Sequence, residues 1–147
     1  MKIAITGVAL RLPKNIDSLD KFWQALINNH QLTSQNTAPR WPESLQKKPY
    51  YKYISDNAFR HFGQLEDIEL FDRKAFKLSA LETIKLDPQH RLLLELSWQA
   101  LEDSKYPAFR NKPLHAGVFV GLCSNDYNQL LSDTNSTPAT PYDALGN

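Results

Sequence analysis

The side chains able to do chemistry in this sequence are few and widely spaced. Cys123 is the only thiol, and as a nucleophile it would need a base such as His90 or His115 beside it. A free cysteine directly after an apolar strand is more often a small buried hydrophobe. We therefore predict a packing role for Cys123 rather than a catalytic one.

The other candidate groups also lack a catalytic arrangement. The four histidines are scattered without the spacing of metal ligands: His30, His61, His90 and His115. No serine lies in a Gly-x-Ser-x-Gly turn, and no glycines are spaced to cradle a phosphate. Acidic pairs such as Glu66-Asp67 are typical of solvated or capping positions. The residues alone therefore predict no catalytic site, no metal and no cofactor.

Composition excludes several classes of protein. The chain has 147 residues, about one domain, with 17 Lys and Arg against 16 Asp and Glu. This balance argues against nucleic-acid binding, although residues 47–53 mix basic and aromatic side chains as single-strand binders do. We predict an exposed loop there, with its tyrosines packed down. One cysteine and no long apolar run favour a cytoplasmic protein that does not span a membrane.

Two segments have the composition of buried strands. Residues 3–10 and 116–122 are apolar with little alternation, which predicts parallel strands covered on both faces. Between them, residues 30–65 lose all periodicity. A loop of that length is usually functional or packed on something larger.

Three helices are predicted from their start signals. Asp17 or Ser18 is the N-cap of a helix whose apolar stripe ends near residues 28–29. Ser79 and Glu82 have the spacing of a capping box. Asp87 and Pro88 begin a third helix that runs to about residue 104.

The third helix is apolar nearly all round, which predicts a helix buried inside a large protein. Its remaining polar side chains are expected to be paired there: Gln89, Arg91, Glu95 and Glu102. Two strands cannot supply the cover that they and this helix need. The chain is therefore expected to be part of a larger domain.

Several motifs, in order along the chain, resemble the β-ketoacyl synthase (ketosynthase) domain of modular polyketide synthases. The most specific is Leu-Asp-Pro-Gln-His-Arg-Leu-Leu-Leu-Glu at residues 86–95, followed by Trp-Gln-Ala-Leu-Glu-Asp at 98–103. The opening strand, the Phe22-Trp23 helix, residues 40–42, the Phe71-Asp72 element with Phe76, and residues 117–121 and 124–127 also match. The resemblance covers essentially the whole chain.

The resemblance implies an α/β, thiolase-like fold of layered helices and sheets (αβαβα), of which residues 1–147 form the opening part of the first half. It also implies a homodimer in the full domain, neighbouring polyketide synthase domains as partners, and an acyl carrier protein that presents substrates on a phosphopantetheine arm. The reaction implied is a decarboxylative Claisen condensation of acyl thioesters with malonyl-type extenders.

The family's catalytic residues do not carry over to this chain. Its nucleophile lies in a Thr-Ala-Cys-Ser-Ser stretch, and its histidines lie in later motifs; neither occurs here. Cys123 matches a different position. We therefore expect the chain alone to be inactive, a fragment or truncated product. Asn125 and Asp126 are predicted to border the acyl channel, because ligands gather where strands of such sheets end. Asp87, Pro88 and Arg91 are predicted to be structural.

Two other interpretations remain open. One is a non-catalytic module that pairs with a complementary condensing-enzyme chain, which would be stable and monodisperse where a fragment would aggregate. The other is an unrelated small α/β binding domain whose motif matches are coincidental.

Overall fold

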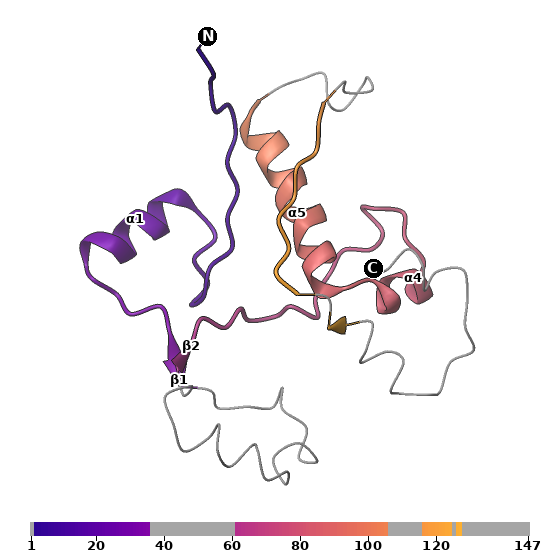
Figure 1. Ribbon diagram of the computed structural model, residues 1–147, viewed down its shortest axis with the longest axis horizontal. Helices are drawn as coiled ribbons and strands as arrows, with labels where there is room; N and C mark the ends of the chain where they lie inside the picture. The colour runs from indigo at the N-terminus through magenta and orange to yellow at the C-terminus, as the bar shows by residue number, and fades with distance from the viewer. Residues whose placement is uncertain (1, 36–60, 106–115, 125, 128–147) are drawn as a thin grey trace, which may run out of the picture. The chain divides into compact units, whose positions relative to one another are not determined.

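The computed structural model describes residues 2–35, 61–105, 116–124 and 126–127 (Figure 1). The chain divides into two compact units. The short-helix unit comprises residues 10–66, and the long-helix unit comprises residues 1–9 and 67–147. Each is described by itself below. No helix among the described residues is long and apolar enough to cross a membrane.

The short-helix unit contains a tight turn followed by helix α1 (Leu19–Ile27). The Leu12 amide donates to the Ile16 carbonyl (2.8 Å), and Lys14 and Asn15 take positive φ angles of 62° and 56° at the tip. Ser18 is the N-cap, and its hydroxyl accepts from the Lys21 amide (3.3 Å). The predicted start and end of this helix are confirmed.

The apolar stripe of α1 is largely uncovered. Ala25 and Ile16 are buried, whereas Trp23 is 61% exposed and Leu26 is 54% exposed. A stripe of this kind normally packs against a core. Most of that packing surface is absent among the described residues of this unit.

A short ladder lies inside the segment predicted as an aperiodic loop. Strand β1 (Ser34–Gln35) pairs antiparallel with β2 (His61–Phe62), with Ser34 opposite Phe62. The loop prediction for 30–65 is therefore wrong at these two places. Residues 36–60, including the basic and aromatic run at 47–53, lie outside the described residues.

The long-helix unit is organised by helices α4 (Ala80–Lys85) and α5 (Pro88–Asp103). The predicted capping box is present before α4: the Ser79 hydroxyl accepts from the Glu82 amide (3.2 Å), and Glu82 Oε2 accepts from the Ser79 amide (2.7 Å). Asp87 is the N-cap of α5 and Pro88 its first residue, so both helix starts are confirmed.

The predicted strands at 3–10 and 116–122 do not form strands in this structure. Neither segment is paired with another strand among the described residues, and both run as extended chain (Figure 1). Ile3 is 83% exposed and Phe119 is 96% exposed. A strand exists only through its ladder, so apolar composition alone gives an extended segment without a sheet.

Helix α5 is only partly covered by the described residues. None of its residues is fully buried, and Trp98 is 45% exposed. One side is packed by aromatic rings. Phe71 stacks on Phe76 at 5.2 Å between ring centroids, and Phe76 meets the edge of Trp98 at 6.3 Å. Within the described residues these rings cover only part of the helix, and its burial all round inside a larger protein stays a prediction.

Candidate functional site

Asp126, one of the two predicted acyl-channel residues, lies on a polar stretch just after the extended segment 116–122. Asp126 is exposed and Tyr127 is half-buried. Asn125 lies outside the described residues. We call Ser124, Asp126 and Tyr127 the Asp126 segment.

The Asp126 segment is tied to the corner between α4 and α5 by two long-range hydrogen bonds. Gln89 Nε2 donates to the Ser124 carbonyl (3.1 Å), and the Tyr127 hydroxyl donates to the Ile84 carbonyl (2.6 Å). Both contacts join parts of the chain more than 30 residues apart. The corner therefore fixes where the segment lies.

The corner itself contains a buried carboxylate. Asp87 is 4% exposed, and its two oxygens accept from the Gln89 amide (2.7 Å) and from Gln89 Nε2 (3.4 Å). A carboxylate this buried requires hydrogen bonds to offset its lost hydration. The side chain that caps α5 thus also orients the side chain that reaches Ser124.

The predicted pairing of polar side chains on α5 is met in part. Gln89 is paired as above, and Glu95 Oε1 accepts from the Asp72 amide (3.4 Å). Arg91 differs: its Nε is buried and has no hydrogen-bond partner among the described residues. The prediction that Arg91 pairs in the helix interior is not met at this atom.

Cys123 is exposed, so its predicted burial is wrong. The physical reason is that the segment before it pairs with no strand among the described residues, and its Val118 and Phe119 are 84% and 96% exposed. His90, one of the two bases considered for it, lies half-buried on α5, and His115 is outside the described residues. No contact in the described structure assigns Cys123 a base.

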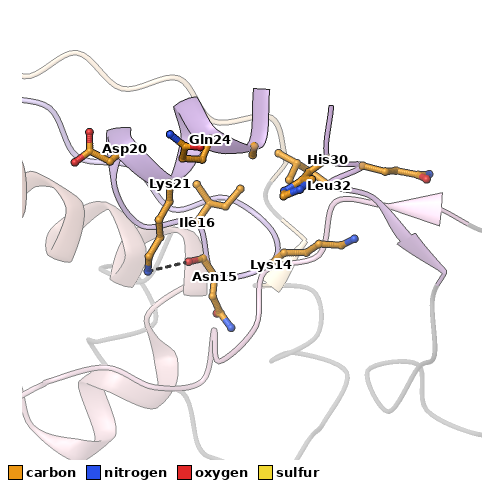
Figure 2. A pocket seen from close by; sticks show the side chains of 10 residues that line it. Lys14, Asn15, Ile16, Asp20, Lys21, Gln24, His30 and Leu32 are labelled. Carbon is orange, nitrogen blue, oxygen red and sulfur yellow. Dashed lines mark hydrogen bonds between the residues drawn. The ribbon is translucent and has the colours of Figure 1, made fainter. Parts of the chain in front are cut away.

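A pocket of about 720 Å³ lies in the short-helix unit (Figure 2). It is open to solvent, and α1, the turn before it and the residues just after it line it. Lys21, a charged residue in its lining, already has partners. Asp17 Oδ1 lies 2.7 Å from the Lys21 ammonium, which also donates to the Asn15 carbonyl (3.4 Å). Its cation is thus already engaged. His30, which lacks the spacing of a metal ligand, lines the pocket, and neither Asp126 nor any residue predicted to be structural does.

Two carboxyl groups have altered proton affinity, both near helix starts. The hydrogen bond from Lys21 lowers the pKa of Asp17, and the Ser79 hydroxyl, followed by the Ser79 amide, lowers the pKa of Glu82. Glu82 belongs to the capping box of α4, and Asp17 belongs to an ion pair beside the Ser18 N-cap, so neither marks a reacting site. No cluster of three or more His, Cys, Asp or Glu able to hold a metal occurs in the part of the chain that the structure describes.

The contact of Tyr127 with α4 was missed by the sequence analysis, and so was the particular partner of Gln89. Neither could be read from local spacing. The sequence hinted at this contact only in placing Tyr127 directly after the polar residues that follow the predicted strand 116–122.

Comparison with known proteins identifies the family. The model of the β-ketoacyl synthase N-terminal domain matches residues 1–147. The chain belongs to this family. The chain is also 35% identical over 147 residues to clavatol synthase claF of Penicillium crustosum, and 35% identical over 144 residues to a mycocerosic acid synthase-like polyketide synthase of Mycobacterium tuberculosis. These matches include 99% and 98% of this chain. They span only 5% and 7% of the length of those two proteins.

A solved ketosynthase supports the fold. The oxazolomycin ketosynthase domain of Streptomyces albus matches with a TM-score of 0.53 and 31% identity, over 67% of this chain and 17% of that one. The thiolase-like fold class is thereby confirmed, and the chain corresponds to an N-terminal portion of a ketosynthase.

Proposed function

We propose that these residues form the N-terminal part of a β-ketoacyl synthase domain that extends acyl chains in polyketide synthesis. The observation that carries the proposal is the family match over residues 1–147. The substrates are an acyl thioester and a malonyl-type extender, each delivered on the phosphopantetheine arm of an acyl carrier protein. The segment needs no cofactor of its own.

The reaction has two steps. A cysteine thiolate of the full domain attacks the acyl thioester, and the carrier thiol leaves. The extender then loses carbon dioxide, and its enolate carbon attacks the enzyme-bound thioester, so that a carbon–carbon bond forms and the cysteine thiolate leaves. Both attacks build negative charge on a carbonyl oxygen, which hydrogen-bond donors must stabilise.

These 147 residues support that chemistry without performing it. Their sequence contains neither the Thr-Ala-Cys-Ser-Ser stretch nor the histidine motifs. Their part is to build the first layers of the fold and to border the acyl channel near Asp126. The full domain acts as a homodimer beside other polyketide synthase domains.

Acyl loading tests the proposal. One protein is the chain alone, and the second is the chain fused to the remainder of the oxazolomycin ketosynthase domain that follows the matched part. Both are incubated with an octanoyl thioester of N-acetylcysteamine, and intact mass is measured. We expect the fusion to gain an acyl group on the host cysteine and the chain alone to gain none.

Cys123→Ser serves as the matched control, and it should leave loading of the fusion unchanged. An acyl adduct on Cys123 would overturn the proposal. So would a fusion that has native-like circular dichroism but gains no acyl group.

A second candidate function is favoured by the exposed extended segments. Ile5 is 85% exposed and Val118 is 84% exposed, on extended chain that pairs with no strand among the described residues and so offers an edge to a partner strand. A module that pairs with a complementary condensing-enzyme chain would use them. Light scattering and thermal unfolding of the chain separate the two functions. A monodisperse chain that unfolds cooperatively favours the module, and concentration-dependent association favours the segment of a larger domain.

A further inference from the structure

We propose that Gln89 and Tyr127 are positioning residues, which hold the Asp126 segment against the α4–α5 corner and so set which acyl chains the channel accepts. The acyl part of this inference rests on the proposed function above. The positioning itself rests on contacts within the long-helix unit. Neither residue is assigned a part in the chemistry.

Gln89 is held in a single orientation by its neighbours. A glutamine amide nitrogen has two N–H donors. Here it faces two acceptors, Asp87 Oδ2 at 3.4 Å and the Ser124 carbonyl at 3.1 Å. Asp87 is almost fully buried and is fixed by its capping bond to the Gln89 amide, so the carboxylate acts as a rigid support. The bond to Ser124 is therefore pre-organised from α5.

Tyr127 makes the second of the two long-range hydrogen bonds, to α4 rather than to α5. The last carbonyls of a helix have no partner inside it and must be satisfied from elsewhere. The Tyr127 hydroxyl satisfies the Ile84 carbonyl in the last turn of α4 at 2.6 Å. The phenol thus ties the far end of the Asp126 segment to α4.

The two ties lie on either side of Asp126, which is exposed. An ionised carboxylate is an acceptor only, and its position decides what it can contact. A displacement of about 1 Å at such a position is enough to change binding. Loosening either tie should therefore alter acyl recognition at the channel border while leaving the condensing residues, which lie elsewhere, intact.

The first arm of the test measures the position of the segment directly in the 147-residue chain. Cys123 is the only thiol, is exposed and precedes Ser124, so a nitroxide label there reports on the segment. We expect Gln89→Met and Tyr127→Phe to increase label mobility in the electron paramagnetic resonance spectrum. Gln99→Met, the same change at an exposed position of α5, should leave the spectrum unchanged. Unchanged spectra for both test variants would overturn the positioning role.

The second arm measures loading of the fusion protein with acetyl to decanoyl thioesters. We expect each test variant to change the KM ratio of decanoyl to acetyl by about threefold or more, with kcat for acetyl nearly constant. A merely structural role would lower loading equally at all chain lengths, and that result would overturn the acyl part. A wild-type fusion that loads no acyl group contradicts the proposed function instead, and the label mobility still decides the positioning.

Discussion

At the residue scale, Gly7 shows how the amino-terminal segment is seated on α5. The Val8 amide donates to Asp103 Oδ2 (2.9 Å), which brings the segment to the end of the helix. A Cβ at residue 7 would collide with the Ala100 carbonyl and lie 2.7 Å from the Ser104 amide nitrogen. The close approach of two backbones therefore requires glycine there.

Gly7→Ala should consequently detach the segment or distort the end of α5. Overpacking of this kind costs about 1–3 kcal/mol. Urea unfolding followed by circular dichroism measures the loss. Gly121→Ala is the matched control, since no described atom lies within 4 Å of a Cβ there. Equal stability of the two variants would contradict the described seating.

The capping box predicts a pH dependence. The pKa of Glu82 is lowered from its ordinary value of 4.5, first by the Ser79 hydroxyl and then by the Ser79 amide. A lowered pKa stabilises the folded state above pH 4.5, and the contribution disappears as pH falls through the folded-state pKa. Helicity at 222 nm should therefore fall over this window. Glu82→Gln should flatten the loss, whereas Glu69→Gln, at an exposed position, should leave it unchanged.

At the element scale, the three predicted helices follow from local chemistry, and the strands do not. Ser18, the Ser79–Glu82 pair and Asp87-Pro88 each satisfy backbone groups within a few residues, so sequence alone located α1, α4 and α5. The segments at 3–10 and 116–122 depend on distant partners. Their failure to form a ladder also explains why Cys123 is exposed.

In the candidate site too, the locally determined feature was predicted and the long-range contacts were not. Asp126 was predicted because it follows an apolar segment, whereas the bonds that hold its neighbours span 35 and 43 residues. Contacts of that range depend on how α4 and α5 meet. No periodicity in the sequence encodes that angle.

Removal of the α5 cap tests the importance of the corner. Asp87→Ala should destabilise the long-helix unit by about 1 kcal/mol, within the usual range of 0.5–2 kcal/mol for lost N-caps. Asp87→Asn keeps an oxygen that accepts from the Gln89 amide, so it should cost less. Urea unfolding of both variants provides the comparison, and a larger loss for the asparagine variant would contradict the capping role.

At the scale of the whole molecule, the uncovered surfaces agree with the family relationship. The stripe of α1, Leu94 and Trp98 on α5, and both extended segments show apolar side chains that a complete fold would cover. The solved ketosynthase is matched over only 17% of its length. We therefore expect these surfaces to be covered in a complete ketosynthase domain.

The central claim is that these residues open a condensing enzyme, and the transcript tests it most directly. Sequencing past the codon for Asn147 should show a frame that continues into a Thr-Ala-Cys-Ser-Ser stretch and then into the histidine motifs. A stop codon directly after Asn147, or a continuation without those motifs, would contradict the claim.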